Sequence, residues 1–236
     1  MTMIVSINQP NYIPYLGYFH RIAKSNTFVF LDNAQFSNNN MHHWNYLKTP
    51  QGKLRIKIPV EYHFKDSINQ ARTKDELLWK QKHLGIIQSN YSKAKYFKEF
   101  FPVFSDLLLS TYQNIADMNI VINEYICKGF GFTTKLVKAS DLEVHTHKEE
   151  RIIDICTVLK AETYLSGPGA RAYQEEKHFT ERGVRLCYTD YHSFEYPQLF
   201  NDFIPDLSVI DYIFNCGFDW DYVERNLIEE KGCVDE

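Results

Sequence analysis

Short apolar runs, each followed by a polar turn and an amphipathic stretch, recur along most of the chain. The pattern predicts a buried strand at residues 3–7, a helix from Pro14 to Lys24 and a second strand at residues 27–31. Pro14 suits a first helical turn because its missing N–H needs no partner there. A strand, a helix and a strand within about 30 residues predict a βαβ unit. Continuously apolar strands are typical of a parallel sheet that is covered on both faces.

The same rhythm returns in the second half of the chain. Strands are predicted at residues 134–137, 163–165 and 184–188, and helices at residues 148–159, 170–177, 204–215 and 220–230. The fold class predicted from this alternation is α/β, with a Rossmann-like, doubly wound and mostly parallel sheet. We expect residues 1–236 to form a single domain, with residues 75–128 as a helical insert within it.

Two stretches depart from the α/β rhythm. Residues 53–60 alternate charged and aliphatic side chains, which predicts a strand with one wet face near a sheet edge. The preceding residues 33–52 are polar and have no clear period, so no element is predicted there. Residues 75–128 have a helical pattern with expected breaks near Ser89 and at Pro102.

Composition and charge narrow the classes of function. The net charge of −4 argues against nucleic acid as the main partner. No basic stretch precedes an apolar core at the N-terminus, and no apolar run approaches about 18 residues, so we expect a cytoplasmic protein without a membrane span. An odd number of scattered cysteines predicts reduced, mostly buried thiols. They are Cys127, Cys156, Cys187, Cys216 and Cys233. The sequence is compatible with a homo-oligomer and does not decide the oligomeric state.

Polar residues follow every predicted strand of the sheet. The leading residues of these turns are Gln9, Asp32, Asp141, Ser166 and Asp190. Because ligands bind at the carboxyl ends of parallel strands, the five turns together predict one polar site. Each turn by itself is more typical of a helix cap.

The stretch from Gln9 to Tyr18 is the most distinctive in the chain. Its two prolines and one glycine fix a rigid turn into a helix N-terminus, which suits phosphate. The step Tyr15-Leu16-Gly17-Tyr18 resembles the His–x–Gly–His motif of the nucleotidylyltransferase and pantothenate-synthetase-like superfamily, with tyrosines in place of both histidines. A second glycine turn, at residues 166–169, favours either phosphate contact or a plain tight turn.

Histidines and cysteines offer weaker candidates. Neither an HExxH motif nor a cysteine-rich spacing accompanies the close pairs His42–His43 and His145–His147, so no metal site is predicted. The more natural role for His43, or for His20, is proton transfer or substrate hydrogen bonding, and we choose His43 as the candidate. Cys156 and Cys216 are interpreted as structural, which leaves a Cys/His-dependent acyltransferase as a minor alternative.

Five blocks of the sequence, in the expected order, resemble the WbqC-like family. They are residues 7–37, 140–142, 148–156, 164–173 and 196–217. The family typically has Asn-Arg-Asn where this chain has His43-Trp44-Asn45, so a basic contact is missing at that point. Because the family is encoded among genes for O-antigen and related surface polysaccharides, the resemblance implies a nucleotide-sugar or amino-sugar setting.

Motifs and resemblance together predict an enzyme, a transferase or amide-forming ligase, that attaches an acyl or aminoacyl group to a free or nucleotide-linked amino sugar. ATP or another nucleotide is the candidate cofactor, and a non-catalytic sugar-nucleotide-binding or scaffold protein is the alternative. Asp32 and His43 are the candidate catalytic residues. The predicted substrate-binding residues are Gln9, Asn11, Tyr12, Tyr15, Tyr18, Gln35, Asn45, Asp141, Lys148, Arg151 and Asp190. The predicted phosphate-binding residues are Ser166, Gly167 and Gly169.

Overall fold

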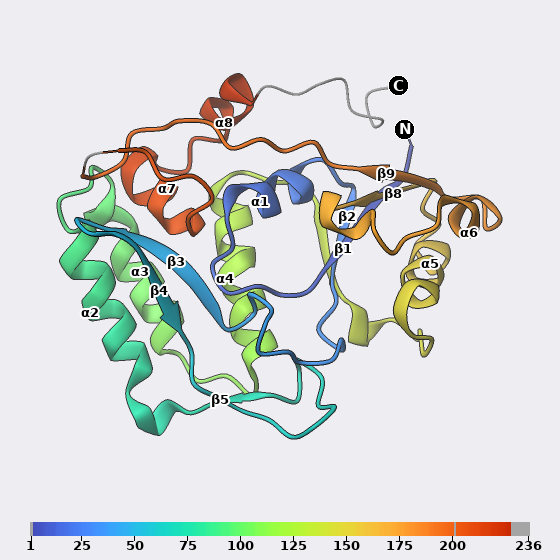
Figure 1. The fold of residues 1–236 in the computed structure, drawn as a ribbon, viewed down its shortest axis with the longest axis horizontal. Helices are drawn as coiled ribbons and strands as arrows, with labels where there is room; N and C mark the ends of the chain where they lie inside the picture. The colour runs from blue at the N-terminus through green and yellow to red at the C-terminus, as the bar shows by residue number, and fades with distance from the viewer. Residues whose placement is uncertain (1, 201, 228–236) are drawn as a thin grey trace.

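Five parallel strands form the central sheet of the computed structural model, which describes residues 2–200 and 202–227 (Figure 1). In chain order they are β1 (Ile4–Asn8), β2 (Thr27–Phe30), β7 (Lys135–Lys138), β8 (Thr163–Ser166) and β9 (Arg185–Tyr188). They lie side by side as β7-β2-β1-β8-β9, and every pairing is parallel. Counted along the chain this is the order 3-2-1-4-5 of Rossmann folds, so the predicted fold class is confirmed.

Helices cover both faces of the sheet because successive strand residues point to opposite sides. Phe28 and Phe30 of β2 pack into one buried cluster, and Val29 between them packs into the other. Figure 1 shows the matching arrangement of helices on the two sides. On one side lie α1 (Leu16–Ala23), α4 (Ile115–Gly129) and α7 (Val209–Cys216), and on the other lie α5 (Lys148–Val158) and α6 (Glu176–Thr180).

Residues 75–128 are helical, as their pattern predicted, and a break follows Tyr91, close to the one expected near Ser89, but no break occurs at Pro102. The helices are α2 (Trp79–Tyr91), α3 (Phe97–Leu109) and α4. Pro102 lies inside α3 instead of ending a helix. A proline there costs about 3 kcal/mol. The burial of Phe97, Phe104 and Leu108 on one face of α3 offsets that cost, so tertiary packing overrides the local signal.

The strand predicted at residues 53–60 does not join the central sheet. It forms an antiparallel hairpin of β3 (Trp44–Thr49) and β4 (Gly52–Lys57), and a second small ladder pairs β5 (Val60–Glu61) with β6 (Arg72–Thr73). The polar sequence of β3 hid its strand because two of its buried residues are polar. Asn45 is buried by donating to the carbonyls of Tyr12 and Ile13.

Two predicted helices have different bounds in the structure. The helix expected at residues 170–177 is instead a 3₁₀ turn (Pro168–Ala170) followed by the short α6. The helix expected from residue 204 begins only at Val209. α8 (Trp220–Asn226) begins where the last predicted helix does but ends at Asn226, because Leu227 is extended; the expected end at residue 230 lies outside the described residues. Among the helices described, none has the length and apolarity that a membrane crossing requires.

The cysteines partly follow the prediction of reduced thiols. Cys127, Cys156 and Cys216 are free. Cys187 of β9, in contrast, is disulfide-bonded, so the prediction is wrong at that position. Spacing along the chain carried no sign of this bond, because cysteine pairing depends on distances in the folded protein. Cys233 lies outside the described residues.

Candidate functional site

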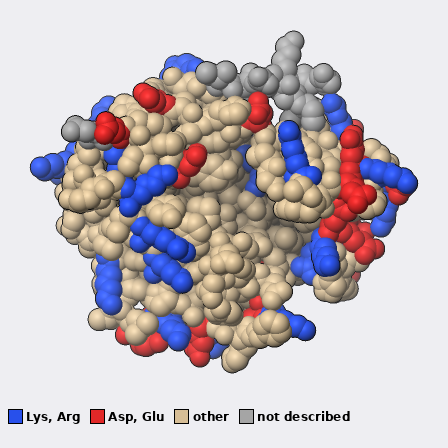
Figure 2. Space-filling view, in the orientation of Figure 1, with Lys and Arg blue, Asp and Glu red and all other residues tan. Residues whose placement is uncertain are grey.

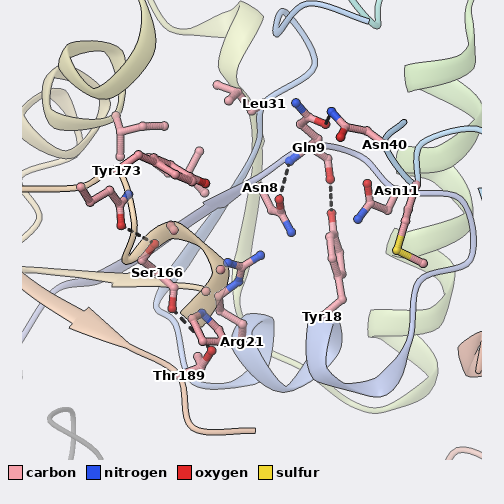
Figure 3. Close-up of a pocket in the computed structure, with 18 of the residues that line it drawn as sticks. Asn8, Gln9, Asn11, Tyr18, Arg21, Leu31, Asn40, Ser166, Tyr173 and Thr189 are labelled. Carbon is pink, nitrogen blue, oxygen red and sulfur yellow. Dashed lines mark hydrogen bonds between the residues drawn. The ribbon is translucent and has the colours of Figure 1, made fainter. Parts of the chain in front are cut away.

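A pocket of about 900 Å³ opens where β1 and β8 end, beside the Ser166–Ala170 turn (Figure 3). β1 and β8 are neighbours in the sheet, but the chain leaves β1 toward β2 and leaves β8 toward β9, in opposite directions. Such a switch point leaves a crevice outside the carboxyl ends of the strands, and Rossmann-like folds bind ligands there. The same face is hollowed near its centre in the space-filling view (Figure 2). The polar lining comprises Asn8, Gln9, Asn11, Tyr15, Tyr18, Arg21, Asn39, Asn40, Lys148, Glu149, Tyr164, Ser166, Tyr173, Gln174 and Thr189.

One wall of the pocket is built of amide side chains from the end of β1, from the loop after it and from the loop before β3. The Asn8 side chain accepts the N–H of Gln9 at 3.0 Å, and Asn40 donates to the Gln9 side chain at 3.2 Å. The Tyr18 hydroxyl donates to the Gln9 carbonyl at 2.9 Å, which ties α1 to this loop. Each amide retains donors or acceptors beyond these bonds. The wall therefore suits a ligand rich in hydroxyl or amide groups.

The opposite wall is the turn after β8. The Ser166 hydroxyl donates to the Gln174 side chain at 2.9 Å, and the Thr189 N–H donates to the Ser166 carbonyl at 2.9 Å. These bonds fix the turn against β9 and the segment before α6. A Cβ atom built on Gly167 would lie only 2.8 Å from the Arg21 Nη1 atom, so a larger residue here would displace the end of that side chain.

Arg21 extends from α1 to the floor of the pocket, and its guanidinium lies between Asn8 and the turn after β8 (Figure 3). The residue is only 8% exposed. Burial raises the pKa of Tyr15, Tyr18 and Tyr164, and the positive charge of Arg21 opposes that rise at each hydroxyl. The floor of the pocket is therefore electrically positive and ringed by tyrosines.

The start of α5 closes the pocket with one basic and one acidic residue. Lys148 and Glu149 both line it. The Glu149 carboxylate accepts the Glu175 N–H at 2.8 Å, and its other oxygen lies 2.7 Å from His178 Nδ1. That hydrogen bond raises the pKa of His178, because a carboxylate favours the charged imidazole. Glu149 is the one carboxylate among the described lining residues.

Half of the residues predicted for the site line this pocket. They are Gln9, Asn11, Tyr15, Tyr18, Lys148, Ser166, Gly167 and Gly169. Sequence reasoning missed Asn8, Arg21 and Glu149. Arg21 lies three residues after Tyr18, which places both on one face of a helix, so extending the motif by one turn would have found it.

The other predicted residues lie outside the lining. They are Tyr12, Asp32, Gln35, His43, Asn45, Asp141, Arg151 and Asp190. Asp32 is buried, and its carboxylate accepts from the Ser140 N–H at 2.9 Å, the Ser140 hydroxyl at 2.6 Å and the Asn69 amide at 3.1 Å. It thus ties the end of β2 to the end of β7. Of the five strand-end turns, three reach this pocket: those led by Gln9 and Ser166, and the turn after β9, which contributes Thr189 in place of Asp190.

His43 lies in a buried aromatic cluster. Both of its ring nitrogens are buried without a hydrogen-bond partner, and the rings of Phe36 and His42 pack against it. Burial lowers the pKa of His43 to about 4, since a charged imidazole would be poorly solvated there. The side chain is thus neutral near pH 7. Arg151 is engaged elsewhere, with the carbonyls of Thr146 and Asn33.

Neither a grouped set of metal ligands nor a reactive thiol is found among the described residues of the pocket. Across residues 2–200 and 202–227, no three His, Cys, Asp or Glu side chains are grouped to hold a metal ion. Burial raises the pKa of both Cys156 and Cys216 to about 12, and the pocket lining includes no cysteine from this part of the chain. A thiolate nucleophile therefore has no place in this pocket.

Comparison with known proteins places the chain in a family. A family model described as the WbqC-like protein family matches residues 9–221. The chain belongs to the WbqC-like family. A relative from Mycobacterium tuberculosis, the uncharacterized protein Rv1507c, is 33% identical over 217 residues, which cover 90% of this chain and 94% of the relative. No solved structure matches the chain. The region matched to the WbqC-like model contains both walls of the pocket from Gln9 onward.

Proposed function

We propose that this WbqC-like protein is an enzyme that transfers an acyl or aminoacyl group to the amine of a nucleotide-linked amino sugar. The observation that carries the proposal is the amide-lined pocket at the switch point of the sheet. Its volume of about 900 Å³ suits a ligand of that size. Asn and Gln side chains both donate and accept hydrogen bonds, which matches sugar hydroxyls and acetamido groups.

The transfer forms a bond between the amine nitrogen and the acyl carbon and breaks the bond from that carbon to its leaving group. The leaving group keeps the electron pair of the broken bond, and the amine must lose a proton. Glu149 is suited to accept it because its carboxylate lines the pocket and is held by His178. ATP would supply the activation of the acyl group, as an acyl phosphate or acyl adenylate. Asp32 and His43 lie outside the lining, so the proposal gives proton transfer to Glu149.

A direct assay tests the proposal. The protein is incubated with UDP- and dTDP-linked amino sugars, candidate carboxylic or amino acids and ATP, and mass spectrometry follows the gain of an acyl group on the sugar. We expect Glu149→Gln to lower kcat by about 100-fold with a much smaller change in KM, because general-base catalysis typically contributes about that factor. The matched control is Glu150→Gln, which removes an exposed carboxylate one residue along α5 and should retain full activity.

The alternative of a non-catalytic sugar-nucleotide-binding protein predicts a different result in the same assay. Nucleotide-linked amino sugars would bind and raise the melting temperature, but no acylated product would form with any donor. That outcome would refute the transferase proposal. Equal losses of activity in the Glu149 and Glu150 variants would refute the assignment of Glu149 alone.

A further inference from the structure

We infer that Arg21 binds the phosphate of the ligand, in a subsite completed by Lys148 and the turn at Gly167. This inference identifies the charged group that the pocket recognises, and it relies on the proposed function only for the rest of the ligand. Its basis is a buried cation without an anion. Arg21 is 8% exposed, and within the described residues no hydrogen bond or ion pair of its guanidinium is formed.

Other buried cations in the described part of the chain do have partners. Lys48 donates to the Gln198 side chain and to the Asp202 carbonyl. Lys80 is paired with Asp75 at 2.9 Å and donates to the Ser110 carbonyl. A charge that is buried without a partner is costly, so proteins keep one where a ligand supplies the missing group. Arg21 fits that description, and its guanidinium is directed into a pocket (Figure 3).

The charges around the guanidinium favour binding of an anionic ligand. The carboxylate of Glu149 is the lining acid within the described residues, and both of its oxygens are engaged by Glu175 and His178. Lys148 adds a second positive charge at the rim of the same pocket. Two cations against one carboxylate, which already accepts hydrogen bonds from other residues, favour a ligand with an anionic group. A guanidinium binds phosphate through two parallel hydrogen bonds, which fixes both position and orientation.

The turn after β8 brings the backbone close enough to share the ligand. Gly167 has no Cβ, and one built there would lie 2.8 Å from Arg21 Nη1. The guanidinium therefore lies against the backbone of this turn, at the carboxyl end of β8. Phosphate groups occupy the equivalent crevice in open α/β sheets, where glycines let the backbone approach them. The phosphate of a nucleotide-linked sugar would sit between Arg21 and this turn, with the sugar along the amide wall.

Binding of inorganic pyrophosphate, measured by isothermal titration calorimetry at low salt, tests the subsite without any acyl transfer. We expect the wild-type protein to bind pyrophosphate at millimolar or lower concentration and Arg21→Met to lose about 100-fold in affinity. The matched control is Arg171→Met. Arg171 is an exposed arginine that stacks over Tyr188 and is absent from the lining, so its loss should change the affinity by less than about threefold.

The inference is overturned if the wild-type protein does not bind pyrophosphate, or if Arg21→Met and Arg171→Met weaken binding equally. Malonate serves as the carboxylate probe, and tighter binding of malonate than of pyrophosphate would also contradict a phosphate subsite. Circular dichroism and the melting temperature establish that Arg21→Met is folded.

Subsite and reaction can fail separately. Arg21-dependent pyrophosphate binding without any acylated product would leave the subsite in place and refute the transferase. Product formation with an unchanged KM for the nucleotide-linked acceptor in Arg21→Met would refute the phosphate subsite and leave the transferase in place.

Discussion

Two buried cations in this WbqC-like protein have opposite surroundings. Lys48 of β3 is 2% exposed, and its ammonium group donates to the Gln198 side chain at 2.9 Å and to the Asp202 carbonyl at 2.6 Å. Arg21 of α1 is 8% exposed and lies against a pocket, with no partner from the described residues. The fold therefore satisfies the first cation itself and leaves the second to a ligand.

The surroundings of Lys48 form a closed network that joins three elements. Buried Asp211 of α7 accepts the hydroxyls of Tyr91 and Tyr196, each at 2.9 Å. The Tyr91 hydroxyl in turn accepts the backbone N–H of Lys48 at 2.8 Å. A polar network of this kind stabilises a fold when every member is satisfied. The contrast teaches that burial alone does not mark a functional charge, whereas burial without a partner beside a cavity does.

Replacing Lys48 with methionine should give the largest effect on stability. The substitution leaves the Asp202 carbonyl without its donor and Asp211 without a nearby cation, so the free energy of unfolding should fall by about 3 kcal/mol. Urea denaturation measures it. Lys53→Met, at an exposed position of the same hairpin, should change stability by less than about 0.5 kcal/mol. Similar values for the two variants would show that the Lys48 network contributes nothing special.

A pH titration should show the next largest effect. Burial raises the pKa of Asp211 from 3.8 to about 6, although the hydroxyls of Tyr196 and Tyr91 oppose that rise. The folded protein therefore holds a proton that the unfolded chain has released, and stability falls as pH rises from about 4 through about 6. The contribution is on the order of 2 kcal/mol.

Urea midpoints measured from about pH 4 to about pH 8 should show this fall in the wild type, and Asp211→Asn should lack the part that Asp211 contributes. The comparison is needed because burial lowers the pKa of His42 and of His43 to about 4. Their effect has the opposite sign, since stability falls as pH drops from 6.5 toward 4. Wild type and Asp211→Asn share this contribution of the two histidines, so it cancels in the comparison. Parallel pH profiles would contradict a protonated Asp211.

Gly167→Ala should weaken pyrophosphate binding by about tenfold, which corresponds to about 1.4 kcal/mol. The new Cβ would displace the Arg21 guanidinium, whose Nη1 atom it would meet at 2.8 Å, a flexible side-chain end that can move. Calorimetry measures the affinity. Gly85→Ala in α2 is the control, because its Cβ would meet nothing within 4 Å. An unchanged affinity in Gly167→Ala would separate the turn from the phosphate subsite.

Arg21→Met should have the smallest effect on the free protein, a change in unfolding free energy within about 0.5 kcal/mol or a slight gain. No protein partner of the guanidinium is lost within the described residues, and a poorly solvated charge is removed. The same urea experiment as for Lys48→Met measures it. A loss as large as that of Lys48→Met would mean that Arg21 is a structural residue after all.

The parts of the fold that follow from local pattern were predictable. β1, α1 and β2 match the predicted strand, helix and strand because apolar runs and a helix-starting proline are local signals. The rule that polar residues at parallel strand ends gather at one edge placed Gln9 and Ser166 at the pocket. These features depend on few contacts between distant parts of the chain.

What could not be predicted depends on partners that are distant in the sequence. β3 was not predicted because its buried residues Asn45 and Lys48 are of types usually found in loops or at the surface. Their hydrogen-bond partners are distant in the sequence. Asp32 looked like a free acid, yet its oxygens are occupied by Ser140 and Asn69. Arg21 was not among the predicted site residues, and only the folded protein shows that its charge is buried without a partner from the described residues.

A crystal structure of the protein with a nucleotide-linked amino sugar tests the central claim about Arg21 most directly. We expect the ligand in the pocket between β1 and β8, with phosphate oxygens at hydrogen-bonding distance from the Arg21 guanidinium and near Gly167. Phosphates bound elsewhere in the molecule, with the guanidinium still lacking an anion, would contradict it.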